Sequence, residues 1–205
     1  EFANHCDQVV APSQTIKELI KSRGVETPIA VLPTGIDWEK YQKADSRRIR
    51  EKYGIKESEI LLLNIGRIEK EKNIELLFEI VVEILKVHEN VKFMMVGEGS
   101  VKKKLMKKAK REKLQDRAFF TGLVSQEEIP DYYIAGDIFL HTSKSETQGM
   151  TINEAMCVEV PTVAIKATGA MDMIDDGVNG VLVNDSKDEF EKTVEGLMKN
   201  EEKRK

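Results

Sequence analysis

Apolar runs and segments of helical periodicity alternate along almost the whole chain. Residues 9–11 and 29–32 are short apolar runs, and the segment between them begins with a cap at Ser13 and stops at Gly24. Serine accepts hydrogen bonds from the free amides at a helix start, and glycine tolerates the left-handed conformation beyond a helix end. We therefore predict a strand, a helix to about residue 23 and a second strand.

The same alternation continues to the end of the chain. Residues 60–65 form a continuous apolar run, as expected for a strand that is buried on both faces of a parallel sheet. Further strands are expected at residues 91–96, 118–121, 138–140, 162–165 and 181–183. Further helices are expected at about residues 45–53, 73–88, 102–113, 125–133, 150–158 and 187–198. The polar tail, residues 200–205, is expected to fray.

This order of elements predicts an α/β fold with a mainly parallel, doubly wound sheet. The chain has no internal repeat or linker, so we expect residues 1–205 to form a single Rossmann-like domain. Ligands of such sheets bind at the carboxyl ends of the strands, where loops lead into helices. The candidate binding loops are therefore those after Ile65, Val96, Thr121 and Leu140.

Composition narrows the class of protein. Of the 205 residues, 40% are hydrophobic and 33% are charged, which is ordinary for a globular protein. The net charge of −4 argues against a general nucleic-acid binder. The two cysteines have no metal-like spacing, and no apolar run has the length of a membrane span or a secretory leader. A cytoplasmic location is the expectation.

Residues 102–113 are rich in lysine. The apolar residues Val101, Leu105, Met106 and Ala109 recur at helical spacing, so one face is expected to pack on the core. The lysines could form a plain solvated face, or they could contact an anionic membrane or an acidic partner.

Two of the candidate loops carry glycine and charge. Gly66, Arg67 and Lys72 follow a strand, where two cations could hold a diphosphate or could simply be solvated. Gly97 and Gly99 lack the third glycine of a dinucleotide-binding fingerprint, because position 102 is lysine. No phosphate-binding P-loop or nucleophilic serine elbow occurs in the sequence.

The loop and helix over residues 145–156 combine two carboxylates with a helix start. Glu146 lies in the loop, Gly149 at the expected helix start and Glu154 within the helix. Carboxylates accept hydrogen bonds from hydroxyls, and a helix start offers free amides to an anion. The two carboxylates could instead be a hydrolytic acid and base, since their separation is not fixed by the sequence. His141 lies at the same edge and could line a pocket.

Glu146 and Glu154 are separated by seven intervening residues, one of which is Gly149. This pattern resembles the signature of a known family: the retaining nucleotide-sugar glycosyltransferases of family four, which have two Rossmann-like domains (the GT-B fold). The matching motifs are Pro12-Ser13, residues 33–37, Gly66-Arg67 with Lys72, residues 96–99, residues 120–122, residues 161–164 and residues 176–180. Gln148 replaces the usual aromatic residue, which makes residues 145–149 similar to enzymes that glycosylate diacylglycerol.

The resemblance implies a role for each matching residue. Arg67, Lys72 and Glu146 would be the catalytic group: the two cations would hold the diphosphate of the donor, and Glu146 would contact the transferred sugar. The other donor-binding residues would be Gln148, Gly149, Met150, Thr151, Glu154, Gly122, Leu123 and Val124. Among these, Glu154 would accept hydrogen bonds from the ribose, and residues 122–124 would border the base. No metal or other cofactor would be required.

The resemblance also implies which part of such an enzyme this is. The chain matches the carboxy-terminal, donor-binding half, and the acceptor site would lie in an amino-terminal half that is absent from this sequence. The expected donor is a UDP-hexose, with UDP-glucose favoured, and the acceptor a lipid or saccharide hydroxyl, with possible contact to the inner face of a membrane. This part alone is expected to be inactive. A nucleotide-sugar epimerase and a non-catalytic nucleotide-sugar-binding module remain alternatives.

Overall fold

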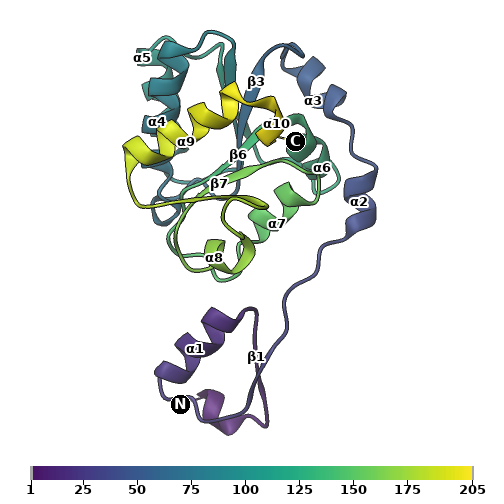
Figure 1. The fold of residues 1–205 in the computed structure, drawn as a ribbon, viewed down its shortest axis with the longest axis vertical. Helices are drawn as coiled ribbons and strands as arrows, with labels where there is room; N and C mark the ends of the chain where they lie inside the picture. Colours follow the sequence, from purple (N-terminus) through teal and green to yellow (C-terminus); the bar gives the residue numbers. More distant parts are fainter. Residues whose placement is uncertain (1, 205) are drawn as a thin grey trace.

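The computed structural model describes residues 2–204, and its main body is built on a six-stranded sheet in which every adjacent pair is parallel (Figure 1). The strand order is β5-β4-β3-β6-β7-β8. The strands are β3 (Ile60–Ile65), β4 (Val91–Val96), β5 (Ala118–Gly122), β6 (Ile138–His141), β7 (Thr162–Ile165) and β8 (Gly180–Val183). From the central pair β3 and β6, successive strands of the chain are added outwards in both directions, which is the doubly wound arrangement. The predicted fold class is confirmed.

Successive residues of the central strands serve two hydrophobic cores. Leu62 packs in the core formed with α4, α5 and α9, whereas its neighbours Leu61 and Leu63 pack in the core formed with α3, α6 and α7. All three side chains are fully buried. A strand alternates its side chains between two faces, so a strand covered by helices on both sides must be apolar throughout.

Helices cover both faces, with α4, α5 and α9 on one side of the sheet and α3 and α6 on the other (Figure 1). The helices of the main body are α2 (Trp38–Gln42), α3 (Ser46–Lys52), α4 (Ile74–Val87), α5 (Lys102–Arg111), α6 (Ile129–Ala135), α7 (Met150–Met156), α8 (Ala170–Met173), α9 (Lys187–Lys199) and α10 (Glu201–Arg204), with a 3₁₀ turn η2 (Lys70–Lys72). No helix within residues 2–204 is long and apolar enough to cross a membrane.

Some helix boundaries differ from the prediction. The short helices α2 and α8 were not predicted, because one turn of helix leaves little periodicity in a sequence. The helix that was expected from about residue 125, with Ser125 as its cap, begins later: α6 starts at Ile129, and Ser125 instead donates its hydroxyl to Glu128. The tail that was expected to fray forms α10, and the Arg204 guanidinium donates to the carbonyls of Leu197 and Met198.

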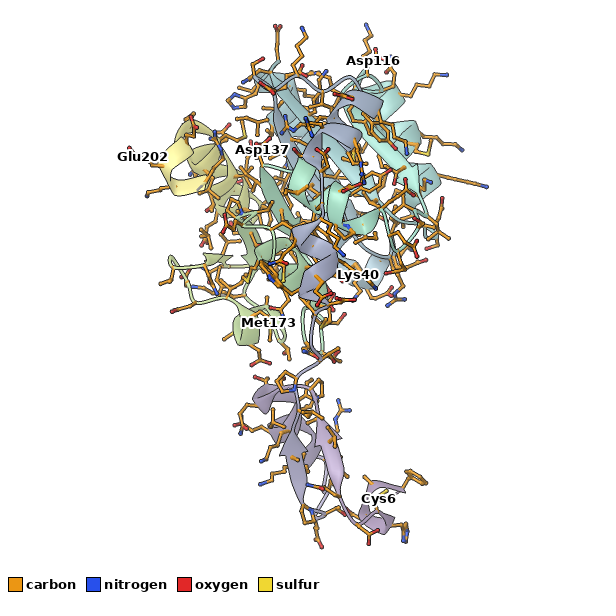
Figure 2. All side chains as sticks on the ribbon, turned by 90° about the vertical axis from the view of Figure 1, so that its right-hand side faces the viewer. Cys6, Lys40, Asp116, Asp137, Met173 and Glu202 are labelled. Carbon is orange, nitrogen blue, oxygen red and sulfur yellow. The ribbon has the colours of Figure 1, made fainter. Side chains whose placement is uncertain are left out.

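Residues 2–31 form a separate unit, in which η1 (Phe2–His5) precedes β1 (Val9–Ala11), α1 (Gln14–Ser22) and β2 (Ile29–Val31). The two strands pair in parallel as a sheet of their own. An extended segment connects this unit to the main body, and Cys6 lies at its far end (Figure 2). Local alternation predicts a strand–helix–strand unit but not its pairing partner, so this separate sheet differs from the single sheet that we expected. The assignment of residues 1–205 to one domain stays a prediction.

The loops at the carboxyl ends of β3 and β4 are packed backbone to backbone. A Cβ atom placed on Gly97 would lie 2.0 Å from the carbonyl oxygen of Gly66, and one on Gly99 would lie 2.2 Å from that of Ile68. Gly97 also has a φ of 137°, which disfavours other residues. The two glycines therefore allow two backbone segments of the protein to approach closely.

We predict that Gly97→Ala lowers the free energy of unfolding by about 1–3 kcal/mol, because the new methyl group must displace the Gly66 backbone. Chemical denaturation measures this effect. Gly196→Ala is the matched control, since Gly196 is exposed within α9 and has open space at its Cβ position. There the methyl group should stabilise the helix by about 0.5–1 kcal/mol. Equal stability of the two variants would contradict this account of the loops.

Candidate functional site

The candidate site lies where the sheet order reverses, between the carboxyl ends of β3 and β6. The crevice at such a point is the usual ligand site of doubly wound sheets. A cavity of about 250 Å³ opens there, and the chain segments that line it are residues 64–67, 141–143, Lys72, Ile74, Glu146 and Thr151. Parallel pairing of β3 with β6 brings the loops after both strands to one place. The Asn64 side-chain amide donates to the carbonyl of Leu140, 76 positions further along the chain.

A lysine and a glutamate form an ion pair in this cavity. Lys72 Nζ lies 2.6 Å from Glu146 Oε1, and the side chains are 17% and 19% exposed. Burial raises the pKa of Glu146, but its polar neighbours, foremost the hydrogen bond from Lys72, outweigh burial and hold this pKa below its usual value. The Thr142 hydroxyl donates to the carbonyls of Lys72 and Asn73, at 3.2 Å each, which fixes the Lys72 backbone against β6.

His141 lies beside this pair and is 5% exposed. Its Nε2 atom is 3.9 Å from Glu146 Oε1 and has no hydrogen-bond partner. Burial lowers the pKa of His141 from 6.5 to about 4; Glu146 opposes this shift and Lys72 adds to it. The imidazole is therefore neutral at pH 7.

A second cavity of about 260 Å³ adjoins the first and shares Ile65, Gly66 and Arg67 with it. Its other side is lined by Leu123, Val124 and Glu154, among other residues. Leu123 is 81% exposed, so an apolar surface is open to solvent at this point. The Arg67 guanidinium pairs with Glu71 at 3.0 Å and is largely exposed, which leaves it room to turn towards either cavity.

Glu154 is held in place by a buried tyrosine. The Tyr133 hydroxyl donates to Glu154 Oε2 at 2.6 Å, and Tyr133 is fully buried. Burial, followed by the charge and hydrogen bond of Glu154, raises the pKa of Tyr133 well above its ordinary value, so the tyrosine stays a hydrogen-bond donor. Tyr133 thereby fixes the orientation of the Glu154 carboxylate, which lines the second cavity.

The start of α7 is shaped by close backbone packing. Gly149 precedes the helix with φ 70° and ψ 39°, a left-handed conformation that suits glycine. A Cβ on Gly169 would lie 2.6 Å from Cβ of Glu146, so the loop after β7 supports the loop that carries Glu146. Gln148 is buried, and its side-chain amide donates to the Thr34 carbonyl at 3.2 Å, away from the cavity lining.

Sequence reasoning selected most of the polar lining. Of the predicted residues, those that line one or both cavities are Arg67, Lys72, His141, Glu146, Thr151, Glu154, Leu123 and Val124. Gly122, Gln148, Gly149 and Met150 border these loops without lining either cavity. The sequence analysis missed Asn64, Thr142, Ser143, Glu98 and Gln126, although all lie at or just after strand ends. Position at a strand end was the signal that could have found them.

A larger cavity, of about 510 Å³, lies at the opposite edge of the sheet, beside Pro161, Gly180 and α10. It is at the amino ends of β7 and β8, so it lacks the convergence of loops seen at the switch point. No group of three or more His, Cys, Asp or Glu side chains among residues 2–204 is placed to hold a metal ion.

Comparison with known proteins identifies the family. The family model described as "Glycosyl transferases group 1" matches residues 45–205, which is well over half of the chain. This chain belongs to that family. The resemblance seen in the sequence motifs is therefore confirmed.

Two of the curated proteins that are similar to this chain have the same name. An alpha-monoglucosyldiacylglycerol synthase of Streptococcus pneumoniae is 32% identical over 88% of this chain, and one of Acholeplasma laidlawii is 28% identical over 90%. The matched regions are 42% and 48% of those two proteins. The chain thus spans about half the length of the curated relatives it matches.

Solved structures agree with the family. Anabaena HepE in complex with UDP-glucose has a TM-score of 0.87 and 25% identity, with 98% of this chain and 57% of that chain covered. The carboxy-terminal domain of a glycosyl transferase group 1 protein (LpcC) from Francisella tularensis has a TM-score of 0.74 and 26% identity, with 83% and 91% covered. The carboxy-terminal GT-B assignment is thus supported by sequence and by structure.

The buried histidine predicts how stability depends on pH. Between about pH 6.5 and pH 4, an unfolded chain protonates His141 whereas the folded protein keeps it neutral, so the free energy of unfolding falls as the pH falls. His141→Gln cannot titrate, so its loss of stability across this window should be smaller by on the order of 2–3 kcal/mol. Urea unfolding at several pH values measures the difference. His5→Gln is the control, because His5 is exposed; an identical pH profile for His141→Gln and wild type would refute the assignment.

Proposed function

We propose that this chain is the donor-binding half of a retaining glycosyltransferase that moves a hexose from a UDP-hexose, with UDP-glucose favoured, to a lipid or saccharide hydroxyl. The observation that carries the proposal is the pair of adjoining cavities that share Arg67. One contains the Lys72–Glu146 pair and the other contains Glu154. Cations between two carboxylates suit a ligand that has phosphates in the middle and hydroxyls at both ends.

The diphosphate would lie between Arg67 and Lys72. Arg67 can give a bidentate contact, whereas Lys72 is a single charge on a flexible stem. Its ammonium is bound to Glu146 in this structure, so it must turn towards the phosphate. Amides in the first turn of α7, near Thr151 in the cavity wall, would add uncharged donors.

The sugar and the nucleoside would occupy opposite cavities. Glu146 would accept hydrogen bonds from hexose hydroxyls on the Lys72 side, with the backbone near Gly149 and Met150 beside it. Glu154, held in orientation by Tyr133, would accept a hydrogen bond from the ribose. Leu123 and Val124 give an apolar surface on which a base can lie.

The chemistry would follow from charge. As the bond between sugar and phosphate breaks, negative charge grows on the diphosphate, and cations already in position lower that barrier. Retention would result if the acceptor attacks on the face from which the diphosphate departs, with a phosphate oxygen taking the acceptor proton. The acceptor site would belong to an amino-terminal half; the two diacylglycerol-named relatives are about twice the length of this chain.

Location at a membrane surface is a further part of the proposal. The names of two relatives refer to diacylglycerol, and an acceptor of that kind would be reached at the cytoplasmic face of a membrane. The lysine-rich helix α5 does not by itself support this: Lys104 pairs with Glu75, Lys108 with Glu79, and Lys102 with Glu98. These pairs favour the solvated-face interpretation of α5.

Calorimetry with this chain tests nucleotide binding directly. We expect UDP to bind with a dissociation constant of about 1 mM or lower. EDTA should leave this affinity unchanged, because Arg67 and Lys72 would supply the positive charge that a metal supplies elsewhere. GDP is the comparison ligand for the base. Absence of binding heat would count against the proposed site, and loss of affinity in EDTA would count against metal independence.

Arg67→Ala should lower turnover of the complete enzyme by on the order of 10²–10³-fold, since one fixed cation is lost from the developing negative charge. Arg47→Ala is the matched control, because Arg47 is also exposed and paired with a neighbouring carboxylate but lies on α3, outside both cavities. Wild-type turnover by Arg67→Ala would contradict the role of Arg67 in holding the phosphate.

Turnover with labelled UDP-hexose, with and without acceptor, separates transfer from epimerisation. The anomeric configuration of the product tests retention.

A further inference from the structure

His141 and Lys72 approach the same oxygen atom. Lys72 Nζ is 2.6 Å from Glu146 Oε1, and His141 Nε2 is 3.9 Å from that atom. Only the first is a hydrogen bond, because a donor and an acceptor must come within about 3.2 Å. The His141 nitrogen is buried and has no hydrogen-bond partner. A buried polar atom without a partner costs free energy and calls for an explanation.

Three charged side chains line the cavity together with His141. Glu146 from the loop before α7, Lys72 from η2 and Arg67 from the loop after β3 line the same cavity. On β7, the residue paired with His141 is Ala164, and on its own strand the nearest ring is that of Phe139, at 6.4 Å between centroids. Glu146 is therefore the one acidic group among the residues that line this cavity.

Binding of an anion would divide Lys72 between two partners. A diphosphate in the cavity attracts the Lys72 ammonium, whose flexible stem allows it to turn while Thr142 holds its backbone. Glu146, at 19% exposure, would then keep a negative charge with its main partner gone. Leaving a largely buried charge without a partner costs free energy, which would oppose binding.

We propose that His141 is a positioning residue that takes over the Glu146 carboxylate when Lys72 turns to the diphosphate of the donor. A movement of about 1 Å brings Nε2 within hydrogen-bond distance of Oε1. Glu146 then keeps its orientation towards the sugar while Lys72 serves the phosphate. The proposal rests on the proposed function for the identity of the anion that draws Lys72 away.

This exchange changes the protonation of His141 in a defined direction. In the structure, Glu146 raises the pKa of His141 and Lys72 lowers it. Departure of Lys72 removes one positive neighbour and leaves the carboxylate, so the imidazole holds a proton more tightly in the complex. Donor binding is therefore accompanied by proton uptake at mildly acid pH.

NMR of ¹⁵N-labelled histidine tests the proposal, because the chain has three histidines and His5→Gln and His88→Gln assign the His141 signals by elimination. Without ligand, His141 should stay neutral to near pH 4. With saturating UDP, its titration midpoint should rise by at least about one pH unit. An unchanged midpoint in a protein that binds UDP would overturn the proposal.

Two variants keep this test separate from the proposed function. Lys72→Met should raise the titration midpoint of His141 without any ligand, because Glu146 then has His141 as its remaining charged partner. An unchanged midpoint in this variant would overturn the proposal, whether or not the wild-type protein binds UDP. His141→Leu should weaken UDP binding about tenfold, whereas His141→Gln, which keeps a donor, should bind within about threefold of wild type and lose the pH dependence. If His141→Leu and His141→Gln weaken UDP binding equally, His141 has a packing role, and the proposed exchange of partners at Glu146 is refuted. Failure of wild type alone to bind UDP would refute the nucleotide site and not the His141–Glu146 pair.

Discussion

Parallel pairing of β3 with β6 at the centre of the sheet is the constraint on which the site depends. The chain winds outwards from this pair in both directions, so the helices after β3 and β6 leave on opposite faces and their loops diverge. A crevice must form where they part. Everything that gives the crevice its chemistry is attached to those two strand ends: Arg67 and Lys72 follow β3, and His141 and Glu146 follow β6.

The crevice keeps its shape because backbones touch behind it. Gly97 lies against Gly66, and Gly169 lies against Glu146, with no space for a methyl group in either contact. These glycines contribute no chemistry to the ligand, yet they fix the loops that do. Close packing of backbone at the loop ends lets a site built on loops be nearly as well defined as the sheet below it.

Charge in the crevice is arranged as a set of alternatives rather than as fixed pairs. Lys72 is bound to Glu146 and Arg67 to Glu71, and Nε2 of the buried His141 has no hydrogen-bond partner. A ligand that brings its own negative charge can rearrange these contacts at low cost, because the cations are already present and partly desolvated. Glu154 is different, since a buried tyrosine holds it in one orientation.

Sequence by itself determined the α/β class, nearly all strands, the long helices and the family, because periodicity, strand-end glycines and motif spacing are local properties. It also selected Arg67, Lys72, Glu146 and Glu154, since each belongs to a motif at a strand end or helix start. Only the tertiary structure decided that β1 and β2 pair apart from the main sheet, that residues 201–204 are helical, and that Gln148 bonds to Thr34. Only the structure placed His141 Nε2 3.9 Å from Glu146 Oε1. These outcomes depend on which distant segments meet, and no local pattern encodes the distance between two side chains.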